Sequence, residues 1–242
     1  MVNVRGEPTT HQRARERRDP EATRQALLRA GAFLFAERGF DGVSTEEVAA
    51  RAGVNKALIS YHFRGKRGLY VAILESGFAS MAARLKAVEE EAPTARAALR
   101  AFLDAFGQVT REEPGFPTLF LREVLAKGLE PAVVPHLVEI VGVSRRLAGR
   151  GVREGLFRRV DPLLLHFGLV GSLVFFFATE PARRRAAAER RVPFAMPDST
   201  AFIDYLEDLT LRGLAPEIPS GRTPGDAPEV RPSRHRRKGA HP

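Results

Sequence analysis

The chain has 242 residues, 44% of them hydrophobic, which is enough for one large domain or two small ones. It contains no cysteine, and this excludes disulfides, thiolate zinc sites and a cysteine nucleophile and fits a reducing cytoplasm. The formal net charge of +9 favours an anionic partner such as nucleic acid, although an arginine-rich proteome would also produce it.

Both ends of the chain are polar and basic. Residues 1–18 carry five arginines, and residues 215–242 are rich in Pro, Gly and Arg with almost no bulky apolar residue. Such composition cannot bury enough apolar surface to fold, so we expect a disordered basic arm and a disordered basic tail. Because there is no apolar signal core near residue 1, we expect a cytoplasmic protein.

The first predicted helix spans residues 19–38. It opens with Asp19-Pro20-Glu21, which supplies an N-cap, a proline at the first helical position and an acid in the first turn. Apolar residues then recur at helical spacing, at Leu27, Ala30, Leu34 and Phe35. We expect Phe33 and Phe40 to help close a small core around this helix.

Residues 44–66 have the pattern of two short helices around a tight turn. Ser44 and Glu47 have the spacing of a capping box, Gly53 suits the turn because glycine tolerates positive φ, and Asn55 can cap the second helix. The pattern is typical of a helix-turn-helix that places its second helix in the major groove of DNA.

On the second of these helices, Ile59 and Phe63 are four residues apart and should pack on the first helix. The opposite side carries small, polar and basic residues. The run 54–67 contains four lysines and arginines and no acid. This outer face is therefore the candidate DNA surface.

The rest of the chain is predicted to be helical. Further helices are expected over about 67–91, 94–112, 116–127, 131–154, 162–178 and 198–213. The arginine-rich residues 181–191 are interpreted as an exposed connection rather than as a second nucleic-acid surface.

Residues 162–178 are the most apolar part of the chain. The run is shorter than the roughly 20 residues that a membrane span needs, contains His166, and lies between Asp161 and Glu180. We therefore expect no membrane association. A helix that is apolar on all sides is otherwise buried on all sides, and a dimer interface backed by the domain core would bury it in this way.

No catalytic signature is present. The sequence has no glycine-rich phosphate loop after a strand, no Gly-x-Ser-x-Gly and no His-x-x-x-His pair. We therefore expect no enzyme activity, no cofactor and no metal site.

Aromatic residues between the helices are the candidates for a ligand pocket, because pockets are mostly apolar with a few polar groups. The predicted lining residues are Phe102, Phe106, Phe116, Phe120, His136, His166 and Phe167. Either histidine could instead be a core residue with an internal hydrogen-bond partner.

Residues 39–70 closely resemble the DNA-binding domain of TetR/AcrR-type transcriptional regulators. The resemblance rests on Gly-Phe before the first short helix, Thr45, the Ala-Gly-Val turn, Tyr-His-Phe, and a lysine three residues after that Phe. It implies an all-α protein with a three-helix DNA-binding head, residues 19–66, and a helical ligand-binding and dimerisation body, residues 67–214. The basic arm of such proteins sometimes also contacts DNA.

The resemblance also implies which residues contact DNA. Phosphate contacts are expected from Thr45, Tyr61, His62 and Lys66, and base contacts from Lys56, Ala57 and Ser60, with Asn55 beside them. Many members carry tyrosine where this chain has Ser60, so their base preferences do not transfer to it.

Relatives dimerise through their last two long helices, which implies an interface of Leu164, Gly168, Gly171, Phe175, Phe202, Leu206 and Leu209. The implied function is a homodimeric repressor that binds an inverted-repeat operator in double-stranded DNA and is released by a small apolar or aromatic effector. The alternatives are a non-specific architectural DNA-binding protein and a helical enzyme or carrier with a vestigial head.

Overall fold

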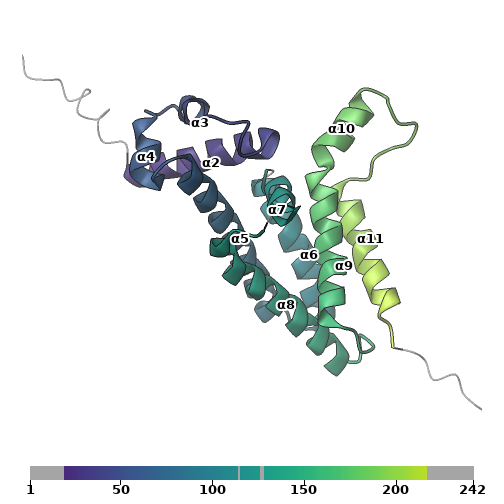
Figure 1. The fold of residues 1–242 in the computed structure, drawn as a ribbon. Helices are drawn as coiled ribbons and strands as arrows, with labels where there is room; N and C mark the ends of the chain where they lie inside the picture. Colours follow the sequence, from purple (N-terminus) through teal and green to yellow (C-terminus); the bar gives the residue numbers. More distant parts are fainter. Residues whose placement is uncertain (1–18, 114, 126–127, 217–242) are drawn as a thin grey trace, which may run out of the picture.

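A computed structural model describes residues 19–113, 115–125 and 128–216, and every regular element within these ranges is a helix. The predicted all-α fold class is therefore confirmed. The predictions for residues 1–18 and 217–242 lie outside the described residues. Figure 1 shows the first three helices gathered at one end of a long helix, α5 (Lys66–Glu91). The rest of α5 packs against part of the body, and the helices of residues 162–213, labelled α9, α10 and α11, lie on the far side of the body from it.

The head consists of α2 (Pro20–Arg38), α3 (Thr45–Ala52) and α4 (Ala57–Phe63). The first helix begins as predicted, because the Asp19 carboxylate accepts a hydrogen bond from the Glu21 amide at 3.0 Å. This local signal fixes where the chain enters the head.

Local hydrogen bonds also fix the turn between α3 and α4. The amide of Glu47 donates to Ser44 Oγ (3.2 Å) and the amide of Ser44 donates to the Glu47 carboxylate (2.8 Å), which completes the capping box. Gly53 adopts the left-handed conformation (φ 65°), and Asn55 Oδ1 accepts from the Ala57 amide at 2.8 Å. The direction of α4 relative to α3 is therefore set within a few residues of chain.

The core of the head differs from the prediction at Phe33. Ile59 and Phe63 are buried as expected, and Phe40 packs edge-on against Tyr70 at 5.1 Å between ring centroids. Phe33, however, is 47% exposed, and the guanidinium of Arg51 lies 3.6 Å above its ring. Successive residues of a helix lie about 100° apart, so the two residues that follow Phe33 take the buried side of α2 and Phe33 does not.

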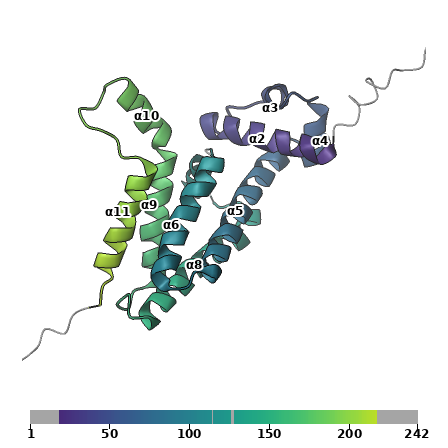
Figure 2. The same cartoon turned by 180° about the vertical axis from the view of Figure 1, so that it is seen from behind.

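Helix α5 (Lys66–Glu91) connects the head to the body. Its 26 residues span about 39 Å at 1.5 Å per residue. One end contacts α2 and α4, and the rest lies along α6 and α8, as both views show (Figures 1 and 2). Its buried face runs almost the whole length, and its large apolar members are Leu69, Ile73, Leu74, Phe78, Met81 and Leu85.

The body is completed by six α-helices and one short 3-10 helix within the described ranges. These are α6 (Ala95–Glu112), α7 (Phe116–Leu125), η1 (Pro131–Val133), α8 (Val134–Arg153), α9 (Pro162–Ala178), α10 (Glu180–Ala188) and α11 (Ser199–Gly213). Most bounds lie within two or three residues of those predicted. The expected connection over 181–191 is exposed, but most of it forms α10, which has no buried residue.

Helix α9 is buried on one side only. Its inner side includes Leu165, Leu169 and Leu173, whereas Leu164 and Phe167 are 70% and 68% exposed. A single chain therefore buries one side of this helix, and the expected burial of the other side in a dimer interface stays a prediction. Among the described residues no single helix is long and apolar enough to cross a membrane, and α9 reaches that length only together with α10, across a bend of 44°.

A close approach at Gly77 seats α7 on α5. A Cβ atom at this position would lie 2.4 Å from two ring atoms of Phe116, whose ring also packs edge-on against Phe78 at 5.3 Å. A Cβ this close would force the Phe116 ring to shift out of its packing with Phe78 and Phe120, so glycine is the residue that fits this contact. Gly77 therefore determines how closely α7 sits on the connecting helix.

We predict that Gly77→Ala destabilises the protein by about 1–3 kcal/mol, because the added methyl overpacks the contact with Phe116. Denaturant unfolding would measure the change. Gly142→Ala is the matched control, since a Cβ there meets only the flexible end of Arg146 at 3.5 Å and alanine is the better helix former. Equal stability of the two variants would contradict the packing argument.

Candidate nucleic-acid interface

The outer face of α4 carries the predicted base-reading residues together. Lys56, Ala57 and Ser60 are all exposed, and Tyr61 beside them is 78% exposed. They are presented outward because Ile59 and Phe63, on the other side of this helix, are almost fully buried in the head. A short helix held by its inner face in this way offers a rigid reading surface.

The predicted phosphate-binding residues surround this face. Thr45 begins α3, Lys66 begins α5, and both are half-buried. The Lys66 ammonium lies 4.4 Å above the ring of Phe40, and the rings of Tyr61 and His62 meet edge to face at 4.9 Å. The Lys66 ammonium and the rings of Tyr61 and His62 therefore already have contacts within the protein.

Glu46 is a residue of this surface that the sequence reasoning missed. Its carboxylate pairs with the Lys56 ammonium at 2.5 Å and accepts a hydrogen bond from the Thr45 hydroxyl at 3.0 Å. The hydrogen bond from Lys56 is the main reason that the pKa of Glu46 falls to about 2. Glu46 and Lys56 are ten residues apart across the turn, so no local pattern pairs them. Two expected DNA contacts are thus occupied by one acid.

A second acid, Glu47, stabilises the start of α3. It accepts from the backbone and hydroxyl of Ser44 and from Arg38 at 2.7 Å. The bond from the Ser44 amide is the main cause that lowers the pKa of Glu47 to about 2. A lowered carboxyl pKa stabilises the fold above pH about 4.5, and that contribution is lost as pH falls towards 2.

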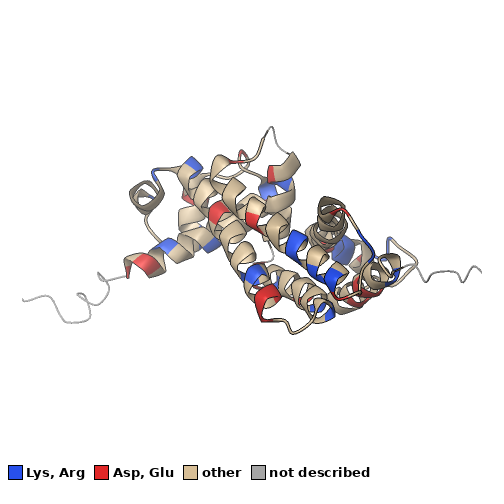
Figure 3. Cartoon of the chain, turned by 90° about the horizontal axis from the view of Figure 1, so that it is seen from below, with Lys and Arg blue, Asp and Glu red and all other residues tan. Residues whose placement is uncertain are grey.

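Charge is interleaved over the described ranges rather than gathered on one face. Lys and Arg recur along the helices with Asp and Glu between them (Figure 3). Many of the cations are paired, as in the two-fold bond between Arg84 and Glu112, with both distances 2.9 Å. The local arrangement at α4, rather than a broad basic field, is therefore what identifies the candidate DNA surface.

The predicted dimer residues divide into two groups. Leu164, Phe175 and Leu209 are 70%, 66% and 51% exposed, and Gly168 and Gly171 have open space where a side chain would be. Helices α9 and α11, which carry them, lie side by side in both views (Figures 1 and 2).

The other two predicted dimer residues face inward. Leu206 is only 5% exposed, and Phe202 stacks on Phe176 with ring centroids 4.0 Å apart. Both are packed within their own chain. The exposed apolar residues of α9 and α11, here called the exposed stripe, are Leu163, Leu164, Phe167, Phe175, Tyr205 and Leu209. Leu163 and Tyr205, which the sequence reasoning missed, are 50% and 61% exposed on the same two helices.

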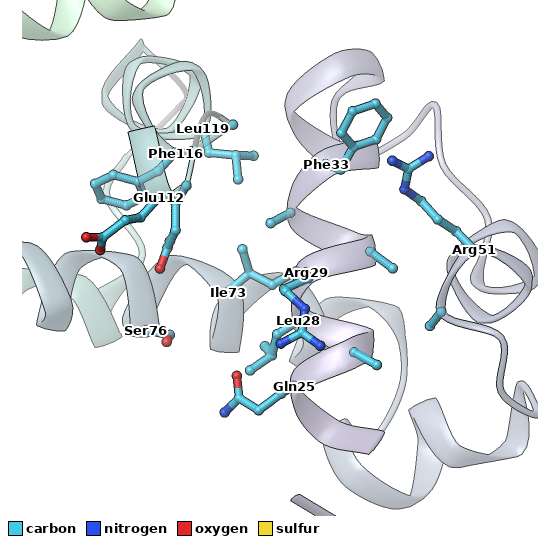
Figure 4. A pocket seen from close by; sticks show the side chains of 16 residues that line it. Gln25, Leu28, Arg29, Phe33, Arg51, Ile73, Ser76, Glu112, Phe116 and Leu119 are labelled. Atoms are coloured by element: carbon cyan, nitrogen blue, oxygen red, sulfur yellow. The ribbon is translucent and has the colours of Figure 1, made fainter. Parts of the chain in front are cut away.

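A cavity of about 800 Å³ lies where the head meets the body. Figure 4 shows α2 and α3 on one side and α5, α6 and α7 on the other, with Arg51 beside Phe33 on the head side. The apolar part of its wall includes Leu28, Ile73, Phe116 and Leu119. A molecule in this cavity would touch both parts of the protein at once.

The polar wall of the cavity carries charges of both signs. Arg29 and Arg51 come from the head, and Glu112 and Glu113 from the end of α6. Desolvation first, and then the neighbouring charge of Glu112, raise the pKa of Glu113. The cavity is thus amphipathic.

Of the predicted pocket residues, Phe116 lines this cavity. Phe102 and Phe106 are buried in the core of the body. Phe120 packs against Phe78, with 4.9 Å between the ring centroids. His166 is 7% exposed and lies 3.1 Å from the Ser144 hydroxyl, and burial lowers its pKa.

Two further pocket candidates lie elsewhere. Phe167 lies on the exposed side of α9 and not in the predicted pocket. Neighbouring residues of α9 form the inner face of this helix instead. His136 is half-buried near the start of α8.

Comparison with known proteins agrees with this geometry. The family model described as bacterial regulatory proteins, tetR family, matches residues 27–73. The transcriptional repressor NicS of Pseudomonas putida is 28% identical over 80% of this chain and 93% of its own length. The transcriptional regulator RutR of Escherichia coli is 32% identical over 60% of this chain and 69% of its own length.

Solved structures share the fold. The transcriptional regulator FadR of Bacillus subtilis, crystallised with stearoyl-CoA, has a TM-score of 0.64 at 16% identity, over 78% of this chain and 98% of its own. The matched residues 27–73 contain all of α3 and α4, the helices that form the candidate DNA surface. The chain therefore belongs to the tetR family of bacterial regulatory proteins and is a helix-turn-helix, DNA-binding regulator of transcription.

Proposed function

We propose that this protein is a homodimeric repressor that binds an inverted repeat in double-stranded DNA and releases it when a small apolar or aromatic effector binds. The observation that carries the proposal is the exposed face of α4, where Lys56, Ala57 and Ser60 project from a helix anchored by Ile59 and Phe63. Residues 19–66 would serve as the DNA-binding head and residues 67–214 as the regulatory and dimerisation body. Two-fold symmetry would place the half-sites about 34–36 Å apart.

The effector part of the proposal rests on the cavity between head and body. Its apolar wall suits an apolar or aromatic molecule, and its volume falls within the range of small-molecule sites. FadR, which shares the fold, is known with an acyl ligand, stearoyl-CoA. An effector that binds one head position better than the other would change DNA affinity by about 1–3 kcal/mol.

Selection of bound sequences from random duplex DNA at near-physiological salt tests the proposal directly. A short inverted repeat is the expected result. Recovery of no consensus, with binding that disappears as salt rises, would instead favour a non-specific architectural protein.

Two lysines separate base contacts from phosphate contacts. Lys56→Ala should relax the preference at one base position by about 1–3 kcal/mol. Lys66→Ala should weaken binding to all sequences about equally and lower the salt slope by about one. Titrations against single-base operator variants at several salt concentrations would measure both, and an unchanged preferred site in Lys56→Ala would disprove the assigned base contact.

Removal of the acid beside Lys56 should strengthen binding. We expect Glu46→Gln to raise DNA affinity about two- to five-fold at low salt. The reason is that Lys56 and Thr45 would no longer have to break their bonds to the Glu46 carboxylate before they contact DNA. Glu37→Gln, on the exposed end of α2, is the control with the same change of charge. An equal gain in both variants would show that only net charge matters.

The exposed stripe on α9 and α11 should form the dimer interface. Phe167→Glu places a charge in that interface and should weaken the dimer at least about ten-fold, since a buried phenylalanine contributes about 1.5–3 kcal/mol. Sedimentation equilibrium would measure the change. Phe194→Glu is the control, because Phe194 is 63% exposed but lies in the connection before α11. A dimer unaffected by Phe167→Glu would place the interface elsewhere.

A further inference from the structure

The C-terminal half of α7 contacts the junction between the head and α5. A Cβ atom at Gly39 would lie 3.0 Å from Nη1 of Arg122, so this guanidinium covers the corner where α2 ends. The next residue, Glu123, is only 6% exposed, and its Oε2 accepts a hydrogen bond from the Tyr70 hydroxyl at 3.3 Å. A helix of the body thus reaches the base of the head.

Glu123 is held from a second side. Its Oε1 accepts from the Glu130 amide at 2.7 Å, and the Glu130 carboxylate forms an ion pair with Arg67 on the first turn of α5. The Glu123 cluster, which consists of Arg67, Tyr70, Glu123 and Glu130, therefore joins α5 to α7 at Tyr70 and to the start of η1 at Arg67. A buried carboxylate is strongly unfavourable unless its oxygens are bonded, so losing a partner from this cluster has a large effect.

The Glu123 cluster continues into the DNA-facing part of the head. The Tyr70 ring meets Phe35 and Phe40 edge-on, at 5.3 and 5.1 Å between centroids, and Lys66 lies over Phe40 at 4.4 Å. Burial first, and then Glu123, raise the pKa of Tyr70 to about 12, so its hydroxyl keeps the proton that it donates. Packed contacts therefore connect Glu123 with a lysine expected to bind phosphate.

We propose that Glu123 is a positioning residue for DNA binding, which holds the head at its DNA-binding angle on the body through Tyr70 and Glu130. This inference rests on the proposed DNA-binding function and adds a route for its regulation. Phe116 and Leu119, on the same helix, line the cavity. A ligand that displaces α7 therefore acts on the Glu123 cluster as well as on the cavity wall.

The test measures the distance between the head and the body, which changes when the head angle changes. The natural chain has no cysteine, so Glu37→Cys in the head and Arg96→Cys in the body allow two spin labels at exposed positions of one protomer. Dilution with unlabelled protein confines the measured distance to one chain. Pulsed electron paramagnetic resonance then gives the head-to-body distance with and without Tyr70→Phe or Glu123→Gln.

We expect both substitutions to shift or widen the head-to-body distance distribution and to raise the Kd for the selected operator about five-fold or more. A reference pair within the body, Arg96→Cys with Ala201→Cys, should keep its distance. Tyr70→Phe retains the aromatic packing and Glu123→Gln retains the shape, so the folded dimer can be compared well below its Tm.

Glu154→Gln is the matched control. Its carboxylate also accepts from a backbone amide, that of Ala95 at 2.6 Å, and from Arg150, but both partners lie in the body. It should lower Tm without moving the head. If Glu123→Gln does not fold, Arg67→Ala removes the partner of Glu130 from an exposed position and tests the same cluster.

Unchanged distances and an unchanged Kd in Tyr70→Phe and Glu123→Gln would overturn the inference, even if Tm falls, because the cluster would then be only structural. The distance measurement needs no DNA. A protein that selects no sequence therefore disproves the proposed function, whereas a protein that selects one but keeps its head angle in both variants disproves only this inference.

Discussion

Helix α5 is buried in both the head and the body, whose apolar residues form one continuous cluster, and the rest of the structure depends on it. Near its start, the side chains of Leu69 and Ile73 lie against Gly31 of α2, inside the head. One turn later, Phe78 packs against Phe116 and Phe120 of α7, inside the body. Because α5 is continuous between these contacts, the head cannot move without a change in how this helix packs on its neighbours.

The residues proposed to contact DNA are paired with the protein's own groups in the free protein. Lys56 is paired with Glu46 and Lys66 lies over Phe40, so the expected contacts are oriented but not free. An exposed ion pair contributes little, about 0–1 kcal/mol, so a phosphate or a base edge can displace Glu46 at small cost. A carboxylate left beside DNA would oppose binding to every sequence alike, so sequence preference would have to come from the proposed base contacts of α4.

The features predicted correctly from sequence are those that neighbouring residues determine. The cap at Asp19, the Ser44–Glu47 capping box and the Gly53 turn each depend on a few adjacent residues, and these features place α2, α3 and α4. Helical periodicity similarly located most body helices.

The features that were missed depend on packing between distant segments. The exposure of Phe33, the inward position of Leu206 and the pairing of Glu46 with Lys56 are decided by which helix lies opposite. The cavity could not be predicted, because its walls come from segments as far apart as α2 and α7. The polar cluster at Glu123 was hidden for the same reason, since its acid and its tyrosine are 53 residues apart.

Helix α7 connects the cavity to the base of the head, which carries the candidate DNA surface, through direct side-chain contacts. Phe116 and Leu119 line the cavity, Arg122 covers Gly39, and Glu123 holds Tyr70, all within one ten-residue helix. A bound molecule can shift the head only by the difference between its affinities for the two head positions. The two affinities differ if the ligand contacts residues that change position when the head moves. The cavity meets this condition, because one of its walls belongs to the head and the other to the body. The proposed coupling between ligand binding and head angle therefore rests on these few side chains of α7. Because α7 also packs against α9, where the Thr118 hydroxyl donates to the Ala178 carbonyl, a shift of α7 also affects the helix that carries the proposed dimer interface.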